Sequence, residues 1–333
     1  MADQELFLLI VTIILALIYA YGNGLNDAAN AVATIVATRV VTPTTAVIIG
    51  GTMNLVGALT GTAVAKTIGK GIVDPDFMTQ TAVMSAILAA VTWVIVATRF
   101  GFPVSVSHSL VAGVLGSGVA TAGIAKINQT IVAKVLMALA FSPILGFIGA
   151  FILMVLLSWA LRKWTLGTVT FIFGKLQIIS AAFLAYSHGK NDAQNAVGIM
   201  ALGWAVYYSA DVTVETWMQF TAGAAIGIGT ALGGWRVINT LGTKITKLNT
   251  ASGFTANVAA AAVIEAASSI GLPVSTTHTS SSAIVGVGAT SGMRRVRFGV
   301  IKGILSAWAI TYPFCFALGW ILSKVLDTVL HGN

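Results

Sequence analysis

Two short stretches decide the fold: Gly24-Leu-Asn-Asp-Ala-Ala-Asn-Ala-Val32 and Gly189-Lys-Asn-Asp-Ala-Gln-Asn-Ala-Val197. A second pair follows them in the same order: Gly101-Phe-Pro-Val-Ser-Val-Ser-His108 and Gly271-Leu-Pro-Val-Ser-Thr-Thr-His278. The members of the first pair begin at residues 24 and 189, and those of the second at 101 and 271, which is nearly the same spacing. Recurrence in order and at near-constant spacing indicates an internal repeat.

The repeat predicts two homologous halves, about 1–165 and 166–333, within one integrated membrane domain. Hydrophobic residues make up 57% of the chain and charged residues 8%, against roughly 25% charged residues in soluble proteins. The mean hydropathy is +0.92. These values indicate a multi-pass protein of the cell membrane and exclude a disordered chain, a disulfide scaffold and a nucleic-acid binder.

Long uncharged runs fill most of the chain. A helix needs about 20 apolar residues to cross a bilayer, so these runs predict an all-α membrane protein with roughly ten to twelve transmembrane or re-entrant helices, several of them broken. The basic residues lie mostly in the gaps, and we expect the Arg294–Lys302 loop to face the cytoplasm. Two halves in one membrane chain are typical of a transporter whose site lies between them. The sequence alone leaves parallel and inverted repeats open.

Two matched aspartates lie inside apolar runs, where an ionised carboxylate is costly unless it is paired, hydrated or bound to a cation. Asparagines flank each one, and on a helix the outer two share a face. The two sets are Asn26, Asp27 and Asn30, and Asn191, Asp192 and Asn195. Such oxygens suit a sodium ion, and an aspartate that carries a proton is the alternative. We expect Gly22, Gly24 and Gly189 to break the helices here.

Hydroxyl residues follow the proline in each member of the second motif pair. They are Ser105 and Ser107 in the first half and Ser275, Thr276 and Thr277 in the second. Helix N-termini in a membrane favour anions, so two such termini predict a site for a tetrahedral oxyanion. The alternative is that the hydroxyls bond back to helix carbonyls. The matched His108 and His278 are either structural or proton-handling residues.

The chain carries no motif of a known enzyme class. It has no G-x-S-x-G elbow, no Walker A or Rossmann pattern and no zinc-type Cys/His spacing. We therefore expect a protein that is not an enzyme and that needs no cofactor. A channel or a receptor subunit remains an alternative class, although broken repeats suit a carrier better.

The paired Gly-x-Asn-Asp-x-x-Asn-Ala and Gly-x-Pro-Val-Ser-x-x-His motifs closely resemble those of the inorganic phosphate transporter (PiT) family, in its compact prokaryotic form. The resemblance implies two inverted repeats and a symporter that imports inorganic phosphate with Na⁺ or H⁺. It implies substrate binding by Asn26, Asn191, Ser105, Ser107, Ser275, Thr276 and Thr277. It implies cation coupling by Asp27, Asn30, Asp192 and Asn195, with Asp27 and Asp192 as the sodium ligands.

The chain departs from this family at two positions that are acidic in many members, where it has Asn54 and Asn257. Hydrogen phosphate can donate a hydrogen bond to a carboxylate and sulfate cannot, so loss of these acceptors weakens discrimination against sulfate. A sulfate permease of the same family and an anion channel are therefore the alternatives. The expected partners are phosphate, the coupling cation and the lipid bilayer; the sequence allows a homo-oligomer without indicating one.

Overall fold

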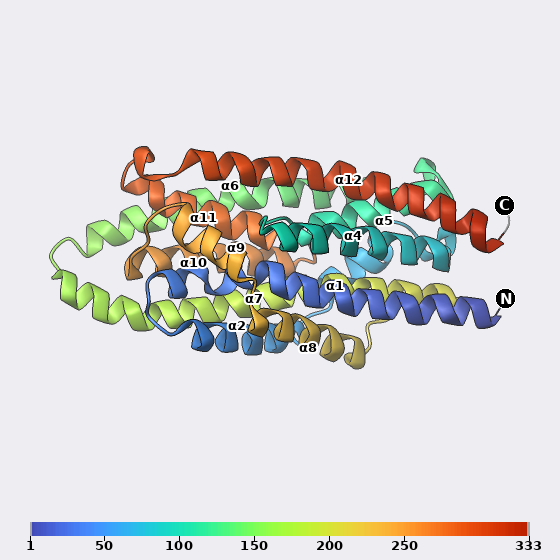
Figure 1. The fold of residues 1–333 in the computed structure, drawn as a ribbon, viewed down its shortest axis with the longest axis horizontal. Coiled ribbons are helices and arrows are strands. Elements are labelled where there is room, and N and C mark those ends of the chain that lie inside the picture. The colour runs from blue at the N-terminus through green and yellow to red at the C-terminus, as the bar shows by residue number, and fades with distance from the viewer. Residues whose placement is uncertain (1, 332–333) are drawn as a thin grey trace.

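The computed structural model describes residues 2–331 and is almost entirely helical (Figure 1). Its long axis follows the long helices, and both chain ends lie at the same end of the molecule. The twelve α-helices of this described range are α1 (Ala2–Ala37), α2 (Pro43–Ala58), α3 (Ala63–Lys66), α4 (Gln80–Phe100), α5 (Val106–Ala122), α6 (Gln129–Ala160), α7 (Leu166–Tyr208), α8 (Thr216–Leu232), α9 (Trp235–Asn239), α10 (Thr250–Ser269), α11 (Thr276–Thr290) and α12 (Phe298–His331).

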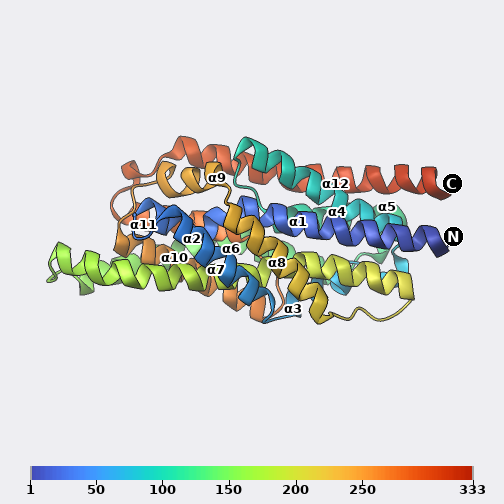
Figure 2. The same ribbon diagram turned by 60° about the horizontal axis from the view of Figure 1, so that its bottom comes forward.

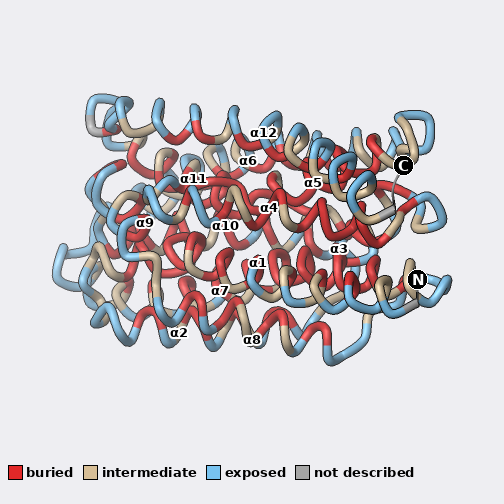
Figure 3. The backbone as a smooth tube through the Cα atoms, turned by 45° about the vertical axis from the view of Figure 1, so that its right-hand side comes forward, coloured by how far each residue is buried: buried red, intermediate tan, exposed pale blue. Residues whose placement is uncertain are grey.

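Five helices, α1, α4, α6, α7 and α12, are long and apolar enough to cross a membrane. A sixth candidate is broken, because α2 and the segment that begins with α3 are bent by 63° across a short break. The outer surface carries large apolar side chains such as Phe141, Leu156 and Ile179, which are 55%, 58% and 66% exposed. Figure 3 shows the buried backbone gathered inside a sleeve of exposed helix faces. These features confirm the predicted all-α, multi-pass membrane fold.

Two helical hairpins enter the molecule from opposite ends and meet near its middle. In Figure 1, α4 and α5 lie toward the end that holds the chain termini, and α10 and α11 lie toward the other end. Each hairpin turns at a glycine with positive φ, Gly101 (72°) and Gly271 (75°), a conformation that glycine adopts without strain. Ser105 then caps α5 and Ser275 caps α11, so two helix N-termini lie deep inside the protein.

The two longest inner helices, α1 and α7, run in opposite directions (Figures 1 and 2). Both pass through their Asn-Asp motifs without interruption, so the prediction that Gly22, Gly24 and Gly189 break them is wrong. The glycines instead allow close helix crossing. A Cβ on Gly24 would lie 2.2 Å from the Ile226 carbonyl oxygen of α8, and one on Gly189 would lie 2.1 Å from the Asn54 carbonyl oxygen of α2.

Close crossing makes Gly189 sensitive to a single added methyl group. We expect Gly189→Ala to destabilise the protein by about 1–3 kcal/mol, because the new Cβ overlaps backbone that cannot move aside. Gly174→Ala in the same helix is the control, since its Cβ would meet only Val40 at 4.0 Å. The thermal unfolding midpoint in detergent measures both. Equal midpoints for the two variants would contradict the packing role of Gly189.

Candidate functional site

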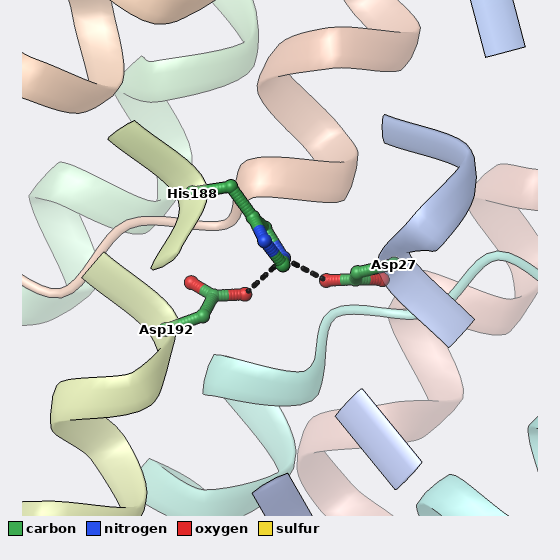
Figure 4. A group of neighbouring side chains, drawn as sticks. All are labelled: Asp27, His188 and Asp192. Atoms are coloured by element: carbon green, nitrogen blue, oxygen red, sulfur yellow. Dashed lines mark ion pairs between the residues drawn. The ribbon is translucent and has the colours of Figure 1, made fainter. Parts of the chain in front are cut away.

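Two carboxylates and one imidazole meet at the centre of the molecule (Figure 4). His188 Nε2 lies 3.2 Å from Asp192 Oδ2 and 3.7 Å from Asp27 Oδ2. Asp27 comes from α1, whereas His188 and Asp192 lie one turn apart on α7. Asp27 and Asp192 are 1% exposed and His188 is 0% exposed. The two motifs that are 165 residues apart in sequence therefore build one buried acidic centre.

A chain of hydrogen bonds fixes the orientation of the His188 ring. Its Nδ1 lies 2.8 Å from Asn54 Oδ1, and the Asn54 amide donates to Thr230 Oγ1 at 2.8 Å. Thr230 in turn donates to the Gly24 carbonyl oxygen at 3.3 Å. Because an amide oxygen only accepts, Nδ1 carries the hydrogen and Nε2 is aimed at the two aspartates. Asn54 thus acts on the centre through His188 and does not touch either carboxylate.

The tip of the second hairpin supplies hydroxyl donors to both aspartates. Thr276 Oγ1 lies 3.2 Å from Asp27 Oδ2 and 3.0 Å from Asp192 Oδ2, and Thr277 Oγ1 donates to Asp27 Oδ1 at 2.7 Å. Hydrogen bonds to a charged acceptor are among the stronger ones in proteins. The α11 N-terminus thus reaches the acidic centre directly.

Each Asn-Asp motif also forms one hydrogen bond to the hairpin of the opposite half. The Asn30 amide donates to Thr277 Oγ1 at 2.9 Å, and the Asn195 amide donates to Ser107 Oγ at 2.9 Å. All four side chains are buried. The structure therefore brings Asn30, Asn195, Ser107 and Thr277 together around the aspartates, as the sequence predicted.

The remaining predicted residues hold the hairpins in place. The Asn26 amide donates to Thr98 Oγ1 and to the Phe102 carbonyl oxygen, at 3.1 and 3.2 Å. The Asn191 carboxamide lies 2.8 Å from Ser268 Oγ, in the matching place of the other half. Ser105 and Ser275 accept from the backbone N–H groups of His108 and His278 as helix caps. A direct role of these four residues in anion binding stays a prediction.

Asn23 is a buried polar residue one turn before Asp27 that the sequence reasoning missed. It precedes Gly24 at the place where His188 precedes Gly189, and it is 0% exposed. Both side-chain polar atoms lack a hydrogen-bond partner among the described residues, as do the carboxamide oxygens of Asn26, Asn30 and Asn195. Unpaired buried oxygens next to carboxylates suit a desolvated cation. The repeat register was the signal that would have found Asn23.

Other candidates lie outside this centre. Asn257 accepts from Thr34 Oγ1 at 2.9 Å, within the packing of α1 against α10. Glu265 forms an ion pair with Lys190, so this lysine is held away from its neighbour Asp192.

The rings of His108 and His278 lie 4.7 Å apart, and His278 stacks on Trp308. Neither imidazole contacts an aspartate within the described residues, which places the pair in aromatic packing.

Comparison with known proteins shows the family of this chain. The profile of the phosphate transporter family matches residues 23–169 and 165–319. A probable low-affinity inorganic phosphate transporter of Bacillus subtilis (strain 168) is 40% identical over 331 residues, with 98% of this chain and 99% of the relative covered. The chain belongs to the phosphate transporter family. A protein of the same description from Rhizobium meliloti (strain 1021) is 42% identical over 309 residues, with 92% of each chain covered.

A solved structure described as the sodium-dependent phosphate transporter has the same fold. Its TM-score is 0.90 at 28% identity, with 97% of this chain and 100% of that chain covered. The expected family and the multi-pass membrane location are therefore confirmed, and the chain is a member of a phosphate-transporting family whose relatives are transporters.

Thr277 offers a test of the centre. We expect Thr277→Val to lower the rate of phosphate uptake by about tenfold or more, because it leaves Asp27 and Asn30 without their partner in a buried site. Ser281→Ala, one turn along α11, is the control, since this buried hydroxyl has no hydrogen-bond partner within the described residues. Uptake of labelled phosphate into proteoliposomes compares the two. If the valine variant took up phosphate at the wild-type rate, the assignment of Thr277 to the site would be wrong.

Proposed function

We propose that the protein is a symporter that imports inorganic phosphate together with Na⁺, through the centre formed by Asp27, His188 and Asp192. The observation that carries the proposal is the junction of two buried carboxylates, one from each Asn-Asp motif, with the N-terminal hydroxyls of a re-entrant hairpin. A binding site for a cation beside a binding site for an anion is the minimum that coupled transport requires.

The charge of the centre supports cation coupling. Two carboxylates and a phosphate dianion together bring four negative charges into a region of low dielectric constant, which is unfavourable unless cations enter with them. Ligand atoms of Asp27, His188 and Asp192 lie within 4.8 Å of one another, and Asn23 and Asn30, within four residues of Asp27 in sequence, have buried side-chain oxygens without a partner among the described residues. Oxygen ligands suit Na⁺, the ion named for the structural relative. Proton coupling is the alternative, with His188 as the residue that faces both carboxylates.

The same carboxylates support phosphate over sulfate. Hydrogen phosphate carries a hydroxyl that can donate to Asp27 or Asp192, whereas sulfate can only accept and would face their charge unpaired. Asn54 and Asn257 do not remove this discrimination, because neither reaches the carboxylates. Among the predicted anion ligands, Thr276 and Thr277 contact the aspartates through their hydroxyls, and Ser107 contacts Asn195.

We propose further that the halves 1–165 and 166–333 are inverted repeats that alternately expose the centre. The opposite directions of α1 and α7 and the entry of the two hairpins from opposite ends support this. The site side chains are buried, so one half must move against the other before a substrate can enter. The loops at the end where α12 begins carry Lys247, Arg294 and Arg297, and by the positive-inside tendency this end faces the cytoplasm.

Removal of either central carboxylate tests the proposal. We expect Asp27→Asn and Asp192→Asn each to reduce sodium-driven phosphate uptake into proteoliposomes by about a hundredfold, because the amide cannot offset a cation's charge. Asp211→Asn, an exposed acid between α7 and α8, is the matched control and should transport like wild type. Near-normal uptake with unchanged sodium dependence in both central variants would refute the assignment.

Substrate choice is tested by parallel uptake of phosphate and sulfate. We expect sulfate uptake to be at least about tenfold slower at neutral pH, since an unpaired acceptor beside a buried carboxylate costs more than 1 kcal/mol. Imposing sodium and pH gradients separately in the same vesicles identifies the coupling ion. Equal rates for the two anions would favour the sulfate permease, and flux that neither saturates nor follows a cation gradient would favour the channel.

A further inference from the structure

A polar cavity lies at the end of the molecule where α10 and α12 begin, away from the acidic centre. It has a volume of about 470 Å³ and lies between the loop before α10, the C-terminal end of α11 and the start of α12. Its polar lining includes Thr246, Lys247, Ser252, Ser291 and Arg297. Ligand pockets usually measure about 300–1,000 Å³, so this cavity is large enough for a small organic molecule.

The cavity carries positive charge that the described protein does not neutralise. Lys247 and Arg297 both line it, and neither forms an ion pair with any carboxylate of residues 2–331. The loops around them, residues 243–249 and 291–297, contain no aspartate or glutamate. Thr246 is only 5% exposed, and no described group forms a hydrogen bond with its hydroxyl. Two uncompensated cations beside a free hydroxyl favour an anionic ligand.

The opposite end of the molecule shows the same backbone arrangement with different side chains. There, the Asn128 N–H donates to the Ile72 carbonyl oxygen at 3.1 Å, as the Arg297 N–H donates to the Ile245 carbonyl oxygen at 3.0 Å. A Cβ on Gly118 would lie 2.7 Å from Val73, just as one on Gly288 would lie 3.0 Å from Thr246. The hydroxyl of Thr246 thus replaces a methyl group of the apolar Val73.

The loops that follow these two positions differ in length and charge. After Val73 the chain continues through Asp74 and a 3₁₀ turn, Pro75–Phe77, to Met78, which is 5% exposed. After Thr246 only Lys247 and Leu248 precede the helix cap Asn249. The loop after Thr246 is shorter, has Lys247 where the other loop has Asp74, and lacks the 3₁₀ turn. The residues that line the cavity on this side, Thr246 and Lys247, therefore have no polar or basic counterpart at the matching positions of the other end, which are Val73 and Asp74.

We propose that this cavity is a second anion site, which binds the phosphate group of a small organic phosphate of nucleotide size from the cytoplasmic side. Lys247 and Arg297 would hold the phosphate group together with the Thr246 hydroxyl, and Met154, Leu248 and Val287 offer an apolar wall to the rest of the ligand. Twelve residues of α11 separate Gly288 from Thr276, so the cavity lies about 18 Å from the acidic centre. It is thus distinct from the transport site.

Binding is tested on the whole protein in phosphatidylcholine nanodiscs without sodium, so that the result does not depend on symport. A fluorescent ATP analogue is titrated, with ATP, AMP and inorganic phosphate as competitors. We expect saturable binding that the double variant Lys247→Gln/Arg297→Gln weakens at least about tenfold, since two charge-assisted contacts are lost. Thr246→Val, which keeps both charges and the side-chain shape, should weaken binding by about threefold or more.

The control variant is Arg294→Gln/Lys302→Gln, which removes the same charge from neighbouring exposed positions outside the cavity. Binding that is absent, or that both double variants weaken equally, would overturn the proposal. Nanodiscs with phosphatidylglycerol distinguish the source of the phosphate group: suppression of the Lys247- and Arg297-dependent signal would assign the cavity to a lipid headgroup, and an unchanged signal to a soluble phosphate. Phosphate uptake by Lys247→Gln/Arg297→Gln within about twofold of wild type confirms that the variant is folded.

Discussion

The burial of two carboxylates against one imidazole is the constraint on which the rest of the structure depends. An unpaired charge in a membrane core costs several kcal/mol, so Asp27 and Asp192 require partners that offset their charge. Donors come from the α11 N-terminus, and His188 is held in place through Asn54. The glycines before each aspartate let α8 and α2 approach closely, which brings the two motifs within reach of each other. Close helix packing and hydrogen bonds to the carboxylates therefore act on the same group of residues.

The two halves share a scaffold but supply different groups to this centre. His188 occupies in α7 the place that Asn23 occupies in α1, and Thr276 occupies in α11 the place that Val106 occupies in α5. The second half thus contributes the imidazole and the hydroxyl that bridges both carboxylates. The first half contributes a carboxamide with no protein partner among the described residues. The two halves therefore place an imidazole at one of the matching positions and a carboxamide at the other.

The sequence predicted the membrane fold, the family and both aspartates of the centre. Composition and a repeated motif can be recognised in a sequence without knowing how the helices pack. It did not predict that α1 and α7 run unbroken, since glycine marks both helix breaks and close crossings, and only the neighbouring backbone distinguishes them. Nor did it predict the direction of side chains around the helix. Asn26 and Asp27 are adjacent, yet one holds the hairpin loop and the other faces the centre.

The hydrogen bonds that cross between the halves relate the static centre to transport. Asn195–Ser107 joins α7 to the hairpin that enters from one end, and Asn30–Thr277 joins α1 to the hairpin that enters from the other. Each of these bonds ties a motif of one half to a hairpin tip of the other, so a movement of one half against the other would have to break them. Thr277 also donates to Asp27, which makes the second contact sensitive to whatever compensates that carboxylate. A cation bound at Asp27 would thus act directly on a contact that joins the two halves.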